Sequence, residues 1–192
     1  MSDYLPNATK DSLRTAALAR RGALEPAARI EASLCVAERV EQLGLPVGAM
    51  VAGFWPIRDE IDPRPLMAGL RERGHGLCLP VVAEPHLIFR ELLRGAELVA
   101  AGFGTVAPGP GAAEVVPDVL LVPLAAFDRT GHRIGYGKGH YDRAIAAIGA
   151  NRPLRLIGVA FAVQEVETVP FEDHDRPLDA IVTETELIRC RA

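Results

Sequence analysis

Apolar residues near the N-terminus recur at the spacing of amphipathic helices. One such pattern runs over residues 9–21, where Thr9 is placed to cap the helix and Lys10 and Arg14 share a face. A second pattern runs over residues 26–44, with proline in its first turn and glycine at its end. We expect the core to cover one apolar face of this second helix, formed by Ile30, Leu34, Ala37 and Val40.

Short, continuous apolar runs follow, and each is typical of a buried strand. The predicted strands cover residues 50–55, 77–82, 86–92, 119–123, 156–161 and 180–183. Helical patterns at 63–73 and 141–148 separate some of them, whereas 95–117, rich in glycine and proline, is typical of an irregular connection. This alternation predicts an α/β fold: an open, mainly parallel sheet with helices on both faces, a three-layer sandwich. Ligands of such sheets bind beyond the carboxyl ends of the strands.

The composition indicates a globular protein and disfavours several function classes. The chain has 192 residues, 49% of them hydrophobic, and we expect a single domain over residues 1–192. A formal net charge of -4 disfavours a nucleic-acid partner, and the longest apolar runs are too short to span a membrane. No secretion signal opens the chain and its three cysteines form no CxxC pair, so we expect a cytoplasmic protein. We expect small-molecule substrates and a monomer or weak homodimer.

Chemistry-bearing residues gather just after the fourth predicted strand. Alternating glycines lead into a helix, and they are Gly135, Gly137 and Gly139. Glycines let backbone amides approach an anion, and a helix N-terminus adds partial positive charge. Lys138 stands between the last two and can place an ammonium against phosphate oxygens. The pattern therefore predicts a phosphate-binding loop.

Two further residues refine this prediction. Asp142 opens the helix after the loop, and a carboxylate beside phosphates is the type of ligand that Mg²⁺ takes. Lysine occurs only at Lys10 and Lys138 among 21 basic residues, which favours both as sites where a compact ammonium is needed. The alternative interpretation is a tight surface turn, with Asp142 only favouring the N-terminus of the helix electrostatically.

The loop and its surroundings resemble one known family. The matching elements, in chain order, are KDSLR at 10–14, EID at 60–62, LP at 79–80, the turn at 102–108, FD at 127–128, Gly131, the stretch 133–142 and the tail 169–179. Together they resemble the signature of the 5-formyltetrahydrofolate cyclo-ligases. The chain departs from it at His140, where the family usually has tyrosine or phenylalanine, and at Ala107, where its turn often has glutamate.

The resemblance implies closure of 5-formyltetrahydrofolate to 5,10-methenyltetrahydrofolate with ATP as co-substrate, Mg²⁺ as its metal, and release of ADP and phosphate. An amide oxygen is a poor leaving group, so N10 of the folate cannot displace it until the formyl oxygen has taken the γ-phosphoryl group. In such a transfer the protein mainly positions the reactants and neutralises charge.

We therefore predict three groups of site residues. The catalytic residues are Lys138, Tyr141 and Asp142, with Asp142 also the metal ligand. The ATP-binding residues are Arg133, Ile134, Gly135, Tyr136, Gly137, Lys138, Gly139, His140, Tyr141 and Arg143, with Lys10 and Arg14 added by the resemblance. The walls for a flat pterin are Phe54, Trp55, Phe127 and Tyr141, and the resemblance adds Glu60 as a substrate-binding carboxylate. We predict loop hydrogen bonds rather than metal ligation for His174, Asp175 and Asp179.

Two other function classes stay open at this point. One is an α/β enzyme that acts on a sugar phosphate or transfers coenzyme A without ATP, with Asp142 as an acid, a base or a structural cap. The other is a non-catalytic nucleotide-binding relative, or an enzyme for another formylated or thiamin-related substrate. Nucleotide hydrolysis coupled to folate would separate both from the main prediction.

Overall fold

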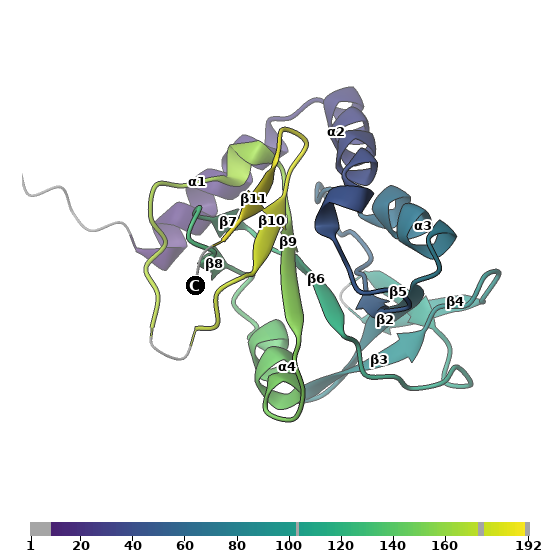
Figure 1. Cartoon of the computed structure of the whole chain (residues 1–192). Helices are drawn as coiled ribbons and strands as arrows, with labels where there is room; N and C mark the ends of the chain where they lie inside the picture. The colour runs from purple at the N-terminus through teal and green to yellow at the C-terminus, as the bar shows by residue number, and fades with distance from the viewer. Residues whose placement is uncertain (1–8, 103, 173–174, 191–192) are drawn as a thin grey trace, which may run out of the picture.

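A mixed, mainly parallel sheet forms the centre of the molecule (Figure 1). The computed structural model describes residues 9–102, 104–172 and 175–190. Within these residues, the seven-stranded sheet has the order β11 (Leu187–Arg189), β10 (Ala180–Val182), β9 (Arg155–Val159), β6 (Val119–Pro123), β1 (Met50–Ala52), β2 (Gly76–Ala83) and β3 (His86–Glu91). The strands from β10 to β2 pair in parallel, whereas β3 and β11 are antiparallel edge strands. The predicted α/β fold is confirmed.

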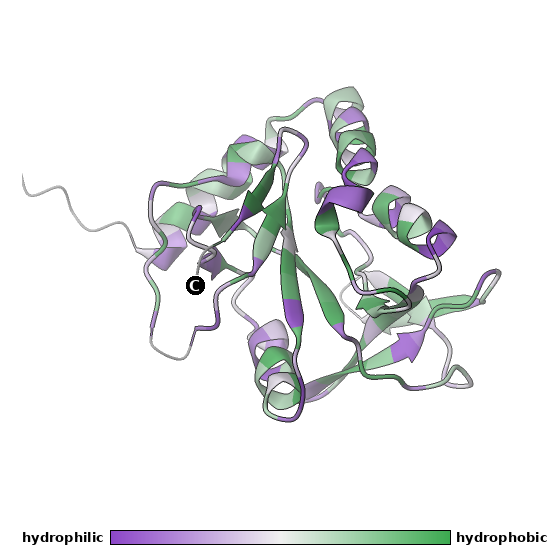
Figure 2. Ribbon diagram, in the orientation of Figure 1, coloured by the Kyte–Doolittle hydropathy of each residue, from purple (hydrophilic) through white to green (hydrophobic). Residues whose placement is uncertain are grey.

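Helices cover both faces of this sheet. Successive strand residues point to opposite faces, and Val119 and Leu121 pack in one core cluster while Leu120 and Val122 pack in the other. The first cluster lies under α2 (Pro26–Glu38), η1 (Val40–Leu43) and α3 (Arg64–Glu72), and the second lies under α4 (His140–Gly149). Figure 2 shows the central strands in the hydrophobic colour, as expected for a sheet buried on both sides.

The first helix closes one end of the sandwich. In α1 (Lys10–Gly22), the side chain of Thr9 accepts a hydrogen bond from the Ser12 N–H at 3.2 Å, so the predicted cap is confirmed. Ala17 of α1 is fully buried against a ribbon formed by β7 (Ala126–Phe127) and β8 (Arg133–Ile134). The helix also contacts η2 (Ala162–Gln164). This packing brings the basic start of α1 to the loop that follows β8.

The order of the strands reverses between β1 and β6. From β1 the chain moves outward to β2, and it later returns to pair β6 on the other side of β1 before continuing to β9 and β10. The connections on the two sides of this point diverge and leave a crevice at the carboxyl ends of the strands. The loops after β1 and β6 therefore meet at the place where open α/β sheets bind ligands.

The prediction of which face of α2 is buried is wrong in part. Ile30 and Leu34 are 65% and 53% exposed, whereas Ala32 and Val36 are buried. Several apolar faces of this helix satisfy the helical spacing, and α2 buries the face that carries small residues against α3. The Ser33 hydroxyl, on the same face, accepts a hydrogen bond from the Asp62 N–H at 3.0 Å and brings the segment before α3 close to α2.

The glycine- and proline-rich segment 95–117 is not irregular throughout. It contains an antiparallel hairpin of β4 (Leu98–Gly102) and β5 (Thr105–Pro108). The sequence prediction missed this hairpin because alanine, glycine and proline have low strand propensity. The hairpin matters for function because its turn reaches the crevice described above.

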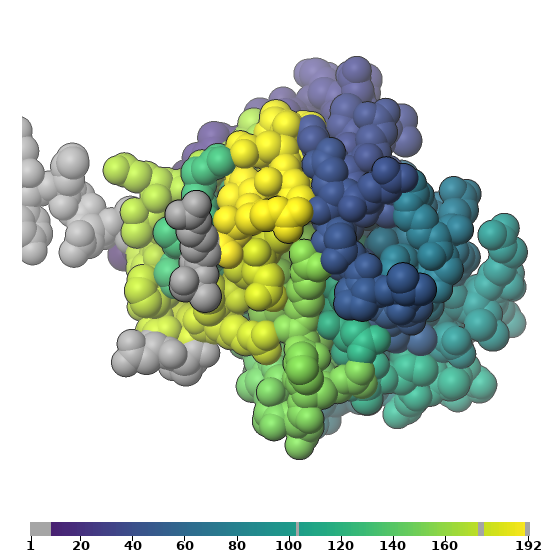
Figure 3. Space-filling view, in the orientation of Figure 1, coloured from purple at the N-terminus to yellow at the C-terminus, as the bar shows by residue number. Residues whose placement is uncertain are grey.

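The C-terminal strands lie against the segment that follows α2, as the space-filling view shows (Figure 3). The Arg39 guanidinium donates hydrogen bonds to the Thr183 and Glu184 carbonyl oxygens at 3.0 and 2.8 Å. Arg189 donates in the same way to the Gln42 carbonyl oxygen at 3.1 Å. These bonds fix the far edge of the sheet. None of the helices in the described ranges has the length and apolar character needed to cross a bilayer.

Candidate active site

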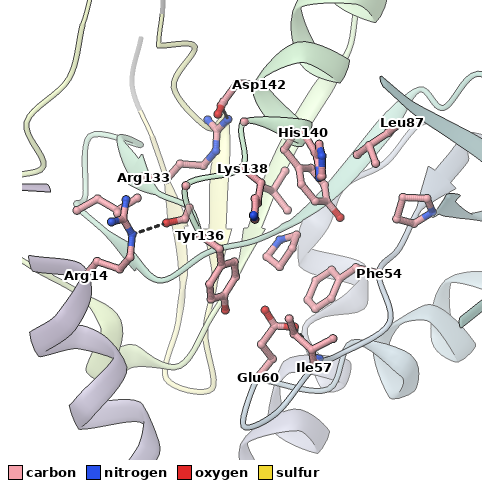
Figure 4. Close-up of a pocket in the computed structure, with 18 of the residues that line it drawn as sticks. Arg14, Phe54, Ile57, Glu60, Leu87, Arg133, Tyr136, Lys138, His140 and Asp142 are labelled. Atoms are coloured by element: carbon pink, nitrogen blue, oxygen red, sulfur yellow. Dashed lines mark hydrogen bonds and ion pairs between the residues drawn. The ribbon is translucent and has the colours of Figure 1, made fainter. Parts of the chain in front are cut away.

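A cavity of about 990 Å³ opens at the carboxyl ends of β1, β2 and β6 (Figure 4). Its lining comes from α1, from residues 54–60 after β1, from the β4–β5 turn and from residues 132–142 around the glycine-rich loop. Small-molecule sites usually have volumes of roughly 300–1,000 Å³. The cavity lies at the upper end of that range, where two substrates can be accommodated together.

The glycine-rich loop joins β8 to α4 and forms one wall of the cavity. Gly137 and Gly139 have φ values of 84° and 66°, in the left-handed region that favours glycine. Gly139 is the N-cap of α4, and no side chain caps the first turn of this helix. Backbone amides at the start of α4 therefore remain available to an anion, which is the arrangement the sequence predicted.

Lys138 lies on this loop with its side chain exposed. Figure 4 shows its amino group directed into the cavity, between Tyr136 and His140. The His140 ring faces Glu84, with 3.3 Å between Nε2 and the carboxylate oxygen, and only 13% of its side chain is exposed. His140 thus lines the cavity beside Lys138.

Asp142 and Arg133 form an ion pair at the rim of the cavity. Arg133 also donates to the Arg176 carbonyl oxygen at 2.7 Å. Burial lowers the pKa of Arg133, while the charges of Asp142 and Asp175 act in the opposite direction. Asp142 is 64% exposed, and within the described residues its carboxylate bonds to Arg133 rather than to the helix backbone, so a carboxylate oxygen can reach a ligand.

The basic residues of α1 reach the same wall. The Lys10 ammonium pairs with Asp175 at 2.8 Å, and Arg14 donates from Nε to the Gly135 carbonyl oxygen at 2.8 Å. Arg14 also pairs with Asp11. Both basic side chains line the cavity, so α1 adds positive charge beside the glycine-rich loop.

The opposite wall is aromatic and carries one carboxylate. Phe54 and Trp55 belong to this wall, while Tyr141 reaches the cavity from the first turn of α4. The guanidinium of Arg64 stacks over the Trp55 ring with 4.8 Å to its centroid. Glu60 faces the cavity, and its carboxylate accepts a hydrogen bond from the Ile57 N–H at 2.9 Å. Burial raises the pKa of Glu60, and hydrogen bonds from Tyr136 and Ile57 oppose that rise.

Two predicted site residues lie elsewhere. Phe127 is fully buried in the core beneath α4, so its prediction as a pterin wall is wrong. Its strand β7 turns the ring inward to the sheet rather than toward the crevice. Arg143 donates to the Pro85 and Lys138 carbonyl oxygens at 2.8 and 3.1 Å and stays outside the lining that the described residues form. It braces the loop instead of facing a phosphate.

The core position of Phe127 has a measurable consequence. We expect Phe127→Ala to lower the free energy of unfolding by about 3–5 kcal/mol, the usual effect of removing a buried phenylalanine ring. Urea unfolding followed by circular dichroism measures this change. Phe171→Ala is the matched control, because Phe171 is 57% exposed and its loss should change stability by less than about 0.5 kcal/mol. Unchanged stability of the Phe127 variant would contradict the assignment.

The acidic residues of the C-terminal tail accept backbone hydrogen bonds where the structure describes them. Asp175 pairs with Lys10, and Asp179 accepts a hydrogen bond from the Leu156 N–H at 2.6 Å. His174 lies outside the described residues. Among the residues that are described, no cluster of three or more histidine, cysteine, aspartate or glutamate side chains could hold a metal ion.

Sequence reasoning missed several residues around the cavity. His132 and Phe171 stack with their ring centroids 3.8 Å apart and line one rim. The buried Arg21 forms an ion pair with the half-buried Asp59 behind the wall that carries Glu60. Arg21 follows Ala17 by four residues and therefore shares the buried side of α1. A charged residue on the predicted buried face of α1 was the sequence feature that could have identified Arg21.

Comparisons with known proteins agree with this geometry. The family model described as the 5-formyltetrahydrofolate cyclo-ligase family matches residues 6–184. The 5-formyltetrahydrofolate cyclo-ligase of Escherichia coli K12 is 34% identical over 176 residues, which cover 88% of this chain and 96% of that protein. The enzyme of the same name from Mycolicibacterium smegmatis is 31% identical over 184 residues, which cover 91% of this chain and 93% of that one.

Solved structures show the same likeness. The NMR structure of Aquifex aeolicus 5,10-methenyltetrahydrofolate synthetase superposes with a TM-score of 0.81 at 30% identity, covering 95% of this chain and 93% of that chain. The structure of a 5,10-methenyltetrahydrofolate synthetase from Mycoplasma pneumoniae has a TM-score of 0.72 at 22% identity, covering 91% and 98% of the two chains. The latter likeness concerns the fold alone.

Proposed function

Because the chain belongs to the 5-formyltetrahydrofolate cyclo-ligase family, we propose that it converts 5-formyltetrahydrofolate and ATP to 5,10-methenyltetrahydrofolate, ADP and phosphate. One observation carries the proposal: a single cavity joins a basic, glycine-rich wall to an aromatic wall with a carboxylate. The first wall suits a triphosphate and the second suits a pterin. The rival reading of a sugar-phosphate enzyme loses its support, since the matched relatives are cyclo-ligases.

The proposed chemistry begins at the formyl oxygen. This oxygen attacks the γ-phosphorus of ATP, the bond from that phosphorus to the β-phosphate oxygen breaks, and ADP leaves. N10 of the folate then attacks the formyl carbon and loses its proton, and the phosphorylated oxygen departs as inorganic phosphate. The formyl oxygen therefore ends in the phosphate that is released. The protein contributes position and charge rather than covalent bonds.

The basic wall is proposed to hold the phosphates. Amides of the loop and of the first turn of α4 donate to phosphate oxygens, and the Lys138 ammonium neutralises charge on the transferred group. Lys10 and Arg14 are proposed as further contacts of the nucleotide, supported by their place in the cavity lining. These assignments rest on position and on the chemistry of the side chains.

Asp142 is proposed to hold Mg²⁺ together with the phosphates. The donor set fits, because this carboxylate is exposed at the rim beside the phosphate-binding loop and Mg²⁺ usually takes one or two carboxylates plus phosphate oxygens. When bound, the ion would neutralise charge on the phosphates. The ion pair with Arg133 holds the carboxylate at this rim.

The aromatic wall is proposed to receive the reduced folate. Tyr141 offers a flat apolar surface to a pterin, and Phe54 also lines the cavity although it is 3% exposed and packs in the core. The Glu60 carboxylate can accept a hydrogen bond from a ring N–H or from N10. Burial and the charge of Glu60 raise the pKa of Tyr141, so its phenol stays protonated at neutral pH and can donate. The cytoplasmic location and the monomeric or weakly dimeric state stay predictions from the sequence.

An isotope experiment tests the proposed route. We expect 5-formyltetrahydrofolate labelled with ¹⁸O in the formyl group to yield phosphate carrying one ¹⁸O atom, read by mass spectrometry or by the ³¹P shift. ATP labelled only in its β-γ bridge serves as the control and should leave the released phosphate unlabelled. Label recovered in water instead of phosphate would contradict phosphorylation of the formyl oxygen.

A further inference from the structure

Arg21 of α1 is a charged side chain buried behind the cavity wall. Only 3% of the side chain is exposed, Nη1 donates to the Tyr136 hydroxyl at 2.5 Å, and Nη2 donates to the Asp59 carboxylate at 2.6 Å. Its Nε finds no hydrogen-bond partner among the described residues. A buried ion pair often stabilises a fold no more than hydrophobic residues of the same size, and an unpaired buried donor costs free energy. Stability alone therefore gives little reason for an arginine here.

The direction of the hydrogen bonds follows from the chemistry of the groups. A guanidinium has only donors, so the Tyr136 oxygen must accept from Arg21. The single phenolic proton of Tyr136 is then left for another acceptor, and the Glu60 carboxylate lies beside this hydroxyl in the cavity (Figure 4). Burial, followed by the nearby charge of Glu60, raises the pKa of Tyr136 and keeps its phenol protonated. The chain of contacts runs from Arg21 through Tyr136 to Glu60.

This chain ends on the cavity surface. Figure 4 shows the Tyr136 hydroxyl and the Glu60 carboxylate facing each other across the cavity wall. The Glu60 carboxylate accepts a hydrogen bond from the Ile57 N–H at 2.9 Å, which holds it beside the Tyr136 hydroxyl. Tyr136 stands between Gly135 and Gly137, in the loop proposed to bind the nucleotide. The same hydroxyl thus connects the phosphate-binding loop to the folate side of the cavity.

Asp59 keeps the arginine in place. Although burial acts to raise the pKa of Asp59, its hydrogen bond with Arg21 and the charge of Arg21 hold that pKa below its ordinary value. Asp59 therefore fixes Nη2 of the Arg21 guanidinium, and Nη1 is directed at the Tyr136 hydroxyl. This geometry is that of a residue that orients a neighbour and makes no contact with substrate.

We propose that Arg21 is a positioning residue for ring closure: by fixing the Tyr136 hydroxyl as a donor to Glu60, it aligns the carboxylate that receives the folate with the loop that holds the phosphates. The inference rests on the proposed function and adds a residue that acts through Tyr136. Its substrate class is the reduced folate bound next to a nucleoside triphosphate.

A double-mutant cycle tests the proposal. Arg21→Met is combined with Asp59→Asn so that no buried charge is left unpaired, and this pair of changes is measured alone, beside Tyr136→Phe and together with it. We expect R21M/D59N and Y136F each to lower kcat/KM for 5-formyltetrahydrofolate by about 10- to 100-fold, the effect of losing a hydrogen bond to a charged group. The kcat/KM of the triple variant should lie within about 3-fold of that of the less active of R21M/D59N and Y136F, because both changes break one chain of hydrogen bonds.

Arg21→Lys keeps the test decisive if R21M/D59N fails to fold. An ammonium preserves the charge opposite Asp59 but lacks the planar fork that reaches Asp59 and Tyr136 together. We expect R21K to remain folded by circular dichroism and to lose about 5- to 10-fold in kcat/KM, and we expect the R21K/Y136F double variant to be no less active than Y136F alone. Arg20→Met is the matched control. Arg20 precedes it on α1, is exposed, and donates to the Val163 carbonyl oxygen at 2.7 Å, so its loss should change kcat/KM by less than about 2-fold.

The possible outcomes separate the two claims. Losses that multiply in the combined variants would show that Arg21 acts independently of Tyr136 and would overturn the inference alone. Full activity of R21K would overturn it as well. Absence of methenyl product with the unaltered protein would overturn the proposed function and, with it, this inference.

Discussion

Replacing Lys138 with alanine is expected to lower kcat by about 10³-fold, because the reaction spreads negative charge over the transferred phosphoryl group. The amino group is directed into the cavity from a loop whose glycines bring backbone amides to the same place. Lys138 is exposed, so its loss should change the free energy of unfolding by less than about 0.5 kcal/mol. The measurement is the near-ultraviolet absorbance of the methenyl product at saturating substrates, with circular dichroism to confirm the fold.

Arg73→Ala is the matched control for the loss of a positive charge. Arg73 is the exposed C-cap residue of α3 and pairs with Glu41 at 2.8 Å, outside the residues that line the cavity. Its replacement should leave kcat within about 2-fold of the unaltered protein. If the Lys138 variant retained more than about a tenth of the activity, the ammonium could not be neutralising the transferred phosphoryl group.

Asp142→Asn should lower kcat/KM for MgATP by about 10²-fold and raise the Mg²⁺ concentration that gives half-maximal activity. Asparagine keeps the shape of the side chain but removes the charge that Mg²⁺ needs from its carboxylate ligand. A titration of Mg²⁺ at fixed ATP measures this shift directly. The readout separates metal binding from a helix-capping role, because loss of a cap would change stability and leave the Mg²⁺ requirement as it was.

The control for Asp142 is Glu41→Gln, which also removes a carboxylate paired with an arginine. Glu41 is exposed on η1, so the Mg²⁺ titration of this variant should superimpose on that of the unaltered protein. An Asp142→Asn protein with an unchanged Mg²⁺ requirement would show that Asp142 serves only as the partner of Arg133.

The architecture could be predicted because the central strands are continuous apolar runs. A strand such as β6 is buried on both faces, and only a sheet covered on both sides accommodates such a run. The same reasoning failed for α2, where Ile30 and Leu34 fit the helical spacing yet lie exposed. The spacing of apolar residues shows that a helix has an apolar face. Which of several such faces becomes buried in α2 is decided by its close packing on α3.

The site was predictable where its residues are neighbours in sequence. Residues from Gly135 to Asp142 form one continuous wall, so their pattern alone indicated a phosphate-binding loop. Phe127 was misplaced because its proximity to the motif in sequence does not say which way β7 turns the ring. The ion pair of Arg21 with Asp59 joins positions 38 residues apart, and it exists only because α1 packs beside the loop after β1.

The most direct test of the account is the complete reaction with components left out one at a time. Purified protein, 5-formyltetrahydrofolate and MgATP are mixed while the near-ultraviolet absorbance of the methenyl product and the release of ADP are followed together. We expect the absorbance to rise only when all three components are present, with one ADP formed for each methenyl product. A rate that is unchanged when ATP is omitted would contradict the account.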